Sequence, residues 1–325
     1  MLRPIHRWLA YLIAGPFLII SLTGCLLLLR AQLEPWLAPD LYAITAGTPT
    51  ANAIRDALVA YAPDRSPQLV RLPADGAPII VRLSGEPRLE VFIDPGSLAI
   101  LGTRDPQNAP TTVILDLHRR LMLGKTGDWI GGIVAILLSA TLISGAWLWW
   151  RGPRRWQLAI RPQHRCFDLH RLLGVVGLPL MLLIAFTGIG LAFPDATRAV
   201  FRQPPRAARM ADVPNAPKPP KASKLDWDAI VSNANLADPS LIMFPRRGGE
   251  PLNVRDRSGA SVQLEPSTLA VTSRKDGREL SGWILALHSG EVGAAGLPLW
   301  LATGLSLFTL LVSGLLLRIH RACGG

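Results

Sequence analysis

The sequence predicts an α-helical membrane protein with four transmembrane helices in two parallel repeats, each repeat containing a small α+β domain. Three observations lead to this fold class: long uncharged segments, unevenly placed basic residues, and motifs that recur in the two halves. About 20 helical residues cross a hydrocarbon core of roughly 30 Å. Four uncharged segments of at least 22 residues therefore predict four spans: Trp8–Leu29, Trp129–Trp150, Leu172–Pro194 and Val292–Leu317.

The net charge of +11 predicts membrane topology rather than nucleic-acid binding. Ten basic residues but one acidic residue lie in three short segments: before the first span, between spans two and three, and after span four. Short loops rich in Lys and Arg stay on the cytoplasmic side. The sequence thus predicts a membrane protein with both termini in the cytoplasm and two exported segments on the other side. The first span is too long for a cleaved signal peptide.

These features predict seven consecutive parts. Residues 1–30 form the cytoplasmic end and first span, 31–128 the first exported domain, 129–150 the second span, 151–171 a basic cytoplasmic loop, 172–194 the third span, 195–291 the second exported domain with its Pro-rich linker, and 292–325 the fourth span with the cytoplasmic C-terminus.

The exported segments share a hairpin signature at an offset of 171 residues. Val91–Ile100 contains Asp94-Pro95-Gly96 between two β-rich runs, and Val262–Val271 contains Glu265-Pro266-Ser267 at the same place. Proline presets the first central dihedral angle of a tight turn. Helical composition at 51–62 and 227–237 precedes each hairpin, so each exported segment predicts a small α+β domain.

The histidines form two pairs under this repeat. His6 and His170 occupy equivalent positions at the cytoplasmic starts of spans one and three, and His118 and His288 precede spans two and four. A pseudo-two-fold axis along the membrane normal places the members of each pair face to face. A flat cofactor on that axis takes one imidazole from each side, which is the bis-histidine arrangement of haem b. The sequence therefore predicts two b-type haems, with these four residues as axial ligands of the iron.

Three arginines directly follow predicted ligands: Arg7, Arg119 and Arg171. Such cations pair with carboxylates, including haem propionates, but they also serve as interfacial anchors, and the sequence does not decide between the two roles. His164 and His320 stay open as substitute ligands. Each span also carries a small pair, namely Thr23-Gly24, Ser144-Gly145, Thr187-Gly188 and Ser313-Gly314, for which close helix packing is the simpler interpretation.

Three stretches resemble the PepSY-associated transmembrane family: Leu117-His118-Arg119-Arg120 with Gly124-Lys125-Thr126-Gly127 leading to Trp149-Trp150-Arg151, then Leu169-His170-Arg171-Leu172-Leu173-Gly174, and the Asp94-Pro95 hairpin of a PepSY-like domain. The layout is most similar to the FoxB-like inner-membrane ferric-siderophore reductases. This resemblance implies an oxidoreductase that transfers electrons through haem to a ferric siderophore or other ferric chelate in the periplasm. By motif, it carries the ligand role to His6, His118, His170 and His288.

Two function classes follow. The first is a di-haem electron-transfer protein that reduces a ferric chelate for iron uptake, with a quinol or a separate cytoplasmic reductase as donor. The second is a PepSY-type membrane-anchored sensor or protease-regulating module without redox activity. The uncharged spans contain no Asp, Glu or His, which disfavours a metal transporter. Neither the chelate nor the catalytic residues follow from the sequence.

Overall fold

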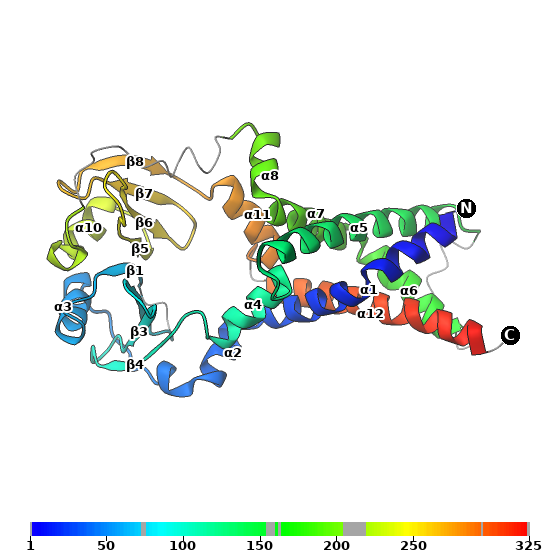
Figure 1. Ribbon diagram of the computed structural model, residues 1–325, viewed down its shortest axis with the longest axis horizontal. Helices are drawn as coiled ribbons and strands as arrows, with labels where there is room; N and C mark the ends of the chain where they lie inside the picture. The colour runs from blue at the N-terminus through cyan, green and yellow to red at the C-terminus, as the bar shows by residue number, and fades with distance from the viewer. Residues whose placement is uncertain are drawn as a thin grey trace. The chain divides into compact units, whose positions relative to one another are not determined.

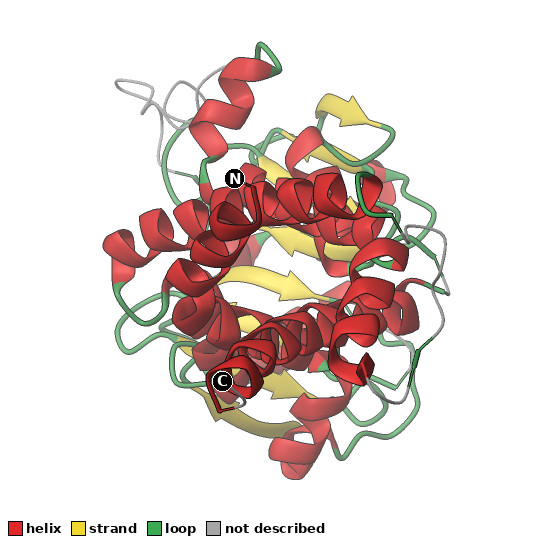
Figure 2. Cartoon of the chain, turned by 90° about the vertical axis from the view of Figure 1, so that its right-hand side faces the viewer, coloured by secondary structure: helices red, strands yellow, loops and turns green. Residues whose placement is uncertain are grey.

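The computed structural model describes residues 2–72, 76–153, 160–161, 164–203, 219–293 and 295–323, and describes side chains in the last helix up to residue 317. The chain forms two compact units. The helical unit contains residues 1–30, 113–203 and 283–325, and the sheet unit contains residues 31–112 and 204–282. Helices and strands are distinguished by colour in Figure 2.

The helical unit contains the apolar helices of a multi-pass membrane protein. Three helices, α1 (Leu2–Leu28), α5 (Gly124–Trp150) and α12 (Gly296–Cys323), have segments long and apolar enough to cross a membrane unaided. Its other described helices are α6 (Arg165–Val176), α7 (Leu178–Ala192), α8 (Pro194–Val200) and the parts of α4 (Pro110–Arg120) and α11 (Leu280–Ser289) that lie in this unit. All are labelled in Figure 1.

The third predicted span is a broken helix rather than one straight segment. Helices α6 and α7 meet at Gly177 with a bend of 66°, and together they satisfy the length and composition of a span. The cause lies in the sequence Gly177-Leu178-Pro179. Proline lacks the N–H of a continuous helix and disfavours helical conformation in the residue before it. The described residues therefore contain three unbroken candidate spans and one bent pair.

A buried apolar cluster holds these helices together. Helix α1 packs against α5 and α12, while α5 packs against α7 and α12 against α6. The buried cluster includes Ile13, Phe17, Leu138, Met181 and Leu307. Several large apolar side chains instead stay exposed, including Trp8 and Leu12 on α1 and Trp129 on α5. Exposed apolar faces of this kind are appropriate for helices surrounded by lipid.

The sheet unit contains eight antiparallel strands in one sheet, in the order β4-β3-β2-β1-β5-β6-β7-β8. The first segment supplies β1 (Pro67–Arg71), β2 (Ile79–Leu83), β3 (Leu89–Ile93) and β4 (Ile100–Arg104), and the second supplies β5 (Pro239–Met243), β6 (Leu252–Asp256), β7 (Ser261–Leu264) and β8 (Val271–Lys275). The predicted hairpins are β3–β4 and β7–β8. Figure 1 labels these strands except β2, and Figure 2 shows the strands as arrows.

The structure corrects the prediction that 31–128 and 195–291 form two separate domains. Strands β1 and β5 pair directly, so the two segments share one sheet. A four-stranded half alone leaves an edge strand with unpaired N–H and C=O groups, and pairing of the two edges removes this cost. The segments of the sheet unit end at 112 and 282 because α4 and α11 continue from them into the helical unit.

Helices α3 (Ala51–Tyr61) and α10 (Trp227–Ala234) contribute to the core of the sheet unit. Ile54 and Leu58 of α3 and Trp227 and Ile230 of α10 are almost fully buried with strand residues such as Val70. Each helix starts at a residue whose side chain accepts a backbone N–H bond, Thr50 for α3 and Asp226 for α10. The remaining short helices are α2 (Arg30–Leu37), η1 (Pro39–Tyr42) and η3 (Ala222–Lys224).

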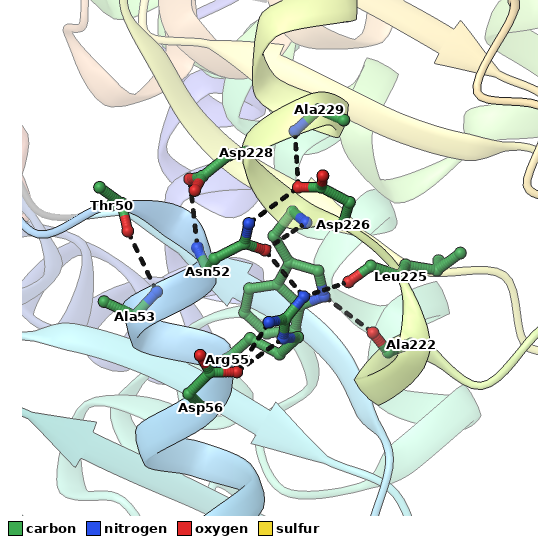
Figure 3. Close-up of polar contacts among 11 residues, drawn as sticks. Thr50, Asn52, Ala53, Arg55, Asp56, Ala222, Leu225, Asp226, Asp228 and Ala229 are labelled. Atoms are coloured by element: carbon green, nitrogen blue, oxygen red, sulfur yellow. Dashed lines mark hydrogen bonds and ion pairs between the residues drawn. The ribbon is translucent and has the colours of Figure 1, made fainter.

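The side chain of Asn52 joins α3 to the start of α10 (Figure 3). Its carbonyl accepts the backbone N–H of Trp227 at 2.8 Å, and its amide donates to Asp226 Oδ1 at 2.8 Å. The backbone N–H of Asn52 also donates to Asp228 Oδ1 at 3.2 Å. This contact links residues 174 to 176 positions apart in the chain.

Candidate functional site

The structure brings the four predicted histidines together in the predicted pairs. The ring centroids of His6 on α1 and His170 on α6 lie 6.5 Å apart, with an interplanar angle of 86°. Those of His118 on α4 and His288 on α11 lie 6.1 Å apart, with an angle of 53°. All four side chains are partly buried within the helical unit. Residues separated by more than 160 positions thus form two compact two-imidazole sites.

Each imidazole is held through Nδ1 by a neighbouring helix. Nδ1 of His6 donates to the backbone O of Thr141 and to Ser144 Oγ, both at 3.0 Å. Nδ1 of His118 donates to the backbone O of Ile20 at 2.9 Å and approaches Thr23 Oγ1 at 3.3 Å. The two rings therefore have the same kind of support, although they lie on different helices.

The partner rings are held in the same way. Nδ1 of His170 donates to Ser313 Oγ at 3.0 Å, with a further bond to the backbone of Leu310. Nδ1 of His288 donates to Thr187 Oγ1 at 3.1 Å, with a further bond to the backbone of Ile184. In all four cases the backbone group lies three residues before the hydroxyl residue.

These contacts fix the tautomer of each ring. A backbone carbonyl oxygen only accepts, so Nδ1 must carry the proton. The hydroxyl protons are already used within their own helices; for example, Thr23 Oγ1 donates to the backbone O of Ile19 at 2.6 Å. Nε2 of each neutral ring is then left with its lone pair, which is the form of histidine that binds metals.

Burial favours the neutral form at the His118–His288 pair. Burial lowers the pKa of His288 to about 4, and the nearby His118 adds to this effect. Burial also lowers the pKa of His118, and the positive charge of Arg119 acts in the same direction. Both rings of this pair are therefore neutral near pH 7, as ligation requires.

The spacing of the rings fits one metal atom between them. Nitrogen–metal bonds of about 2 Å, with about 1 Å from nitrogen to ring centre, place two opposed imidazole centroids about 6 Å apart. The observed centroid separations are 6.5 and 6.1 Å. Within the described residues no group of three or more His, Cys, Asp or Glu is placed to hold a metal ion. A two-imidazole donor set suits a metal whose other ligands come from a macrocycle, so these residues fit a haem.

The small pairs in the spans lie against these rings. A Cβ atom placed on Gly24 meets Cε1 of His118 at 3.0 Å, and one on Gly145 meets Cε1 of His6 at 3.0 Å. The corresponding distances are 3.4 Å from Gly188 to His288 and 3.5 Å from Gly314 to His170. The sequence alone predicts helix packing for these pairs. The sequence contains a signal for this contact, since the histidine pairs and the Ser/Thr-Gly pairs recur together in the two halves of the chain. Which helix faces each ring is decided only by the tertiary structure.

The three predicted arginines differ in their surroundings. Arg7 and Arg119 are exposed. Arg171 lies 3.4 Å from Asp168, a fully buried carboxylate that also forms an ion pair with Arg161 at 2.8 Å. The carboxylate therefore partly compensates the charge of Arg171 beside His170. No sequence motif predicts this role of Asp168.

The two remaining histidines are His164 and His320. His164 is exposed at the start of α6. The side chain of His320 lies outside the described residues, so its proposed substitute role stays a prediction.

The two hairpins of the sheet unit differ as their sequences suggested. Asp94 is buried and accepts from the backbone N–H of Thr45 at 2.6 Å and the hydroxyl of Ser97 at 2.5 Å. These hydrogen bonds hold its pKa well below the usual range. Glu265 occupies the equivalent turn position but is exposed, with a bond from Ser267 at 3.2 Å. The first hairpin is thus tied to the segment around Thr45.

Comparisons with known proteins agree with this architecture. Part of the chain is 30% identical over 150 residues to the uncharacterised protein PA4219 of Pseudomonas aeruginosa, which covers 40% of this chain and 36% of that relative. The match therefore spans little more than a third of the relative's length. The sequence profile of the PepSY-associated TM region matches residues 3–321, nearly the whole chain. The protein is a member of the PepSY-associated transmembrane family.

Proposed function

We propose that the protein is a di-haem b electron-transfer protein of the bacterial inner membrane that reduces a ferric siderophore or another ferric chelate in the periplasm. The observation that carries this proposal is the pair of facing imidazole sites, each with Nδ1 anchored and with ring centroids 6.5 and 6.1 Å apart. When bound, two b-type haems supply one-electron transfer between the two membrane faces.

The proposed topology has four spans, with α6 and α7 together as the bent third one. The basic segments 1–7, 151–171 and 318–325 lie in the cytoplasm under the positive-inside rule. This places His6 and His170 at the cytoplasmic face and His118 and His288 at the periplasmic face. Electrons enter at the first pair, from a quinol or a cytoplasmic reductase, and leave at the second.

The proposed repeat relates the two halves of the chain. Each half contains an apolar helix, a helix with four strands, a short helix ending near a histidine, and a second apolar helix. The hairpin turns repeat even in backbone conformation, with φ of 60° at Leu98 and 56° at Leu269. A pseudo-two-fold axis relating the halves accounts for one ligand of each pair coming from each half.

The chain's residues perform three tasks in this function. The Nδ1 bonds hold each imidazole so that Nε2 faces its metal, and the apolar packing around Phe17 and Met181 excludes water between the two sites. Arg7, Arg119 and Arg171 are proposed partners of haem propionates. Reduction of the ferric substrate by one electron releases iron, because Fe(II) binds oxygen-donor chelators far more weakly than Fe(III).

The absorption spectrum of the purified protein, produced with haem available, tests the proposal. We expect a Soret band and a haem-to-protein ratio near two. His118→Ala or His288→Ala should remove about half of the haem, while His164→Ala, at an exposed histidine, should remove none. Absence of the Soret band would refute the redox function and favour a PepSY-type sensor or protease-regulating module. Unchanged haem content in both pair variants would refute the ligand assignment.

Reduction assays with a panel of ferric siderophores identify the substrate. The haem-loaded protein is reduced chemically, mixed with each chelate, and Fe(II) is trapped by a ferrous-specific dye. We expect reoxidation of the protein to match the Fe(II) formed in a one-to-one ratio per electron. Reoxidation without Fe(II) would show that the chelate is not the acceptor.

A further inference from the structure

Each of four helices presents the same three-part element to a histidine: a backbone carbonyl, a hydroxyl three residues later, and a glycine next to the hydroxyl. These elements end at Gly24 on α1, Gly145 on α5, Gly188 on α7 and Gly314 on α12. The carbonyl and hydroxyl bind Nδ1, and the glycine faces Cε1. The three groups of one element therefore set both the orientation of the histidine ring and its distance from the neighbouring helix.

The glycine contacts divide the four rings into two classes. At Gly24 and Gly145 an added methyl group meets Cε1 at 3.0 Å, so the ring or the helix must shift by a few tenths of an ångström. At Gly188 and Gly314 the contact is 3.4 and 3.5 Å, which is ordinary van der Waals contact. His118 and His6 thus lie too close to the neighbouring helix for an alanine at the glycine position, whereas His288 and His170 leave room for one.

We propose that each facing pair combines one clamped histidine with one adjustable histidine. His118 and His6 are clamped by Gly24 and Gly145, and their partners His288 and His170 are adjustable. This inference rests on the proposed haem function, in which the clamped ring sets the position of the metal and the adjustable ring completes the coordination. The four Ser/Thr-Gly pairs are positioning elements for these ligands.

The hydrogen bonds at Nδ1 are of the same kind at all four rings, so the division rests on the glycine positions. A backbone carbonyl and a hydroxyl bind Nδ1 of each ring. Two acceptors at Nδ1 leave each ring little freedom to rotate in its plane. Groups that orient a ligand in this way change metal affinity by about 10- to 100-fold when they are removed.

Four matched alanine variants test the inference in the full-length protein. Gly24→Ala should weaken haem binding at the His118–His288 site, and Gly145→Ala at the His6–His170 site, each by at least about 10-fold. Gly188→Ala and Gly314→Ala act on the same two sites but should keep the haem content within about two-fold of the parent. Haem content and the low-spin electron paramagnetic resonance signal of each site are the readouts.

A second set of variants separates positioning from folding. Thr23→Val has nearly the same shape but offers no acceptor to Nδ1 of His118, and Thr23→Ser restores the hydroxyl. We expect an altered low-spin signal at one site in Thr23→Val, recovery in Thr23→Ser, and equal unfolding temperatures of the haem-free proteins. An unaltered signal in Thr23→Val overturns the positioning role.

The outcomes distinguish this inference from the function on which it rests. A parent protein without haem overturns the proposed function. The unfolding temperatures of the haem-free alanine variants then test the division into clamped and adjustable histidines. Gly24→Ala and Gly145→Ala should unfold at lower temperature than Gly188→Ala and Gly314→Ala. A parent that binds haem, together with equal losses in all four alanine variants, overturns the division into clamped and adjustable histidines.

Discussion

Val70 of β1 lies directly opposite Ile242 of β5 in the sheet, and both side chains are fully buried. The two residues come from segments that are separated in the chain by two apolar helical segments and more than 150 residues. Their pairing makes one eight-stranded sheet from the two segments. The segments therefore depend on each other for burial of their central strands.

A disulfide bond can test this pairing. Arg71 and Leu241 are opposite each other in the register, and opposed residues of antiparallel strands have Cα atoms about 4.5–5.5 Å apart, within disulfide reach. We expect Arg71→Cys with Leu241→Cys to crosslink under mild oxidation, detected as a linked peptide by mass spectrometry. Arg71→Cys with Met243→Cys is the control, since this diagonal pair is about 7–8 Å apart. Crosslinking only in the control would contradict the register.

The junction between α3 and α10 should be sensitive to charge at residue 52. Asn52→Asp replaces an amide that donates to Asp226 with a carboxylate facing Asp226 and Asp228. The lost bond and the repulsion should reduce local stability by about 1–2 kcal/mol. Faster hydrogen exchange of the α3 and α10 amides measures this change. Asn233→Asp adds the same charge at an exposed position of α10, where the amide makes a single 3.2 Å bond to the backbone O of Leu269, and should change exchange less.

Asp94 should make the stability of the sheet unit depend on acid pH. Hydrogen bonds from Ser97 and Thr45 lower its pKa below the unfolded value, so its stabilising contribution is present at neutral pH and is lost as the pH falls below the usual Asp range. Asp94→Asn should therefore unfold at lower temperature than the parent at pH 7, with a difference that narrows in acid. Glu265→Gln, at the exposed equivalent position, is the matched control and should change the unfolding temperature at pH 7 less than Asp94→Asn does.

Asp168 should tune the His6–His170 site in the haem-loaded protein. Asp168→Asn removes the carboxylate that compensates Arg171 and Arg161, so positive charge next to His170 increases. Positive charge disfavours the oxidised form, and the reduction potential of this site should rise. Potentiometric titration of each site measures the effect. Asp128→Asn, which removes one of the two carboxylates that pair with Arg120, should affect the His118–His288 site instead. Equal shifts at both sites would contradict this prediction.

The sequence determined the apolar helices, the two hairpins and the pairing of the histidines. Uncharged length is sufficient to indicate a membrane helix, and the recurring offsets place His6 with His170 and His118 with His288. Helix and strand composition likewise placed α3, α10 and the turns at Asp94 and Glu265. The helices and turns are local patterns that depend on neighbouring residues, and the pairing of the histidines follows because such patterns recur in the two halves of the chain.

The tertiary structure decided what the local patterns leave open. Pairing of β1 with β5 depends on two edges that are distant in sequence, so two predicted domains became one sheet. The contact of each Ser/Thr-Gly pair with a histidine depends on which helix packs against which. A Ser/Thr-Gly pair is the same in the sequence whether it packs against another helix or against a histidine ring. An added Cβ atom lies 3.0 Å from Cε1 of His118 at Gly24 but 3.4 Å from Cε1 of His288 at Gly188. Only the packing distinguishes these two positions, because the space at each glycine depends on both packed surfaces.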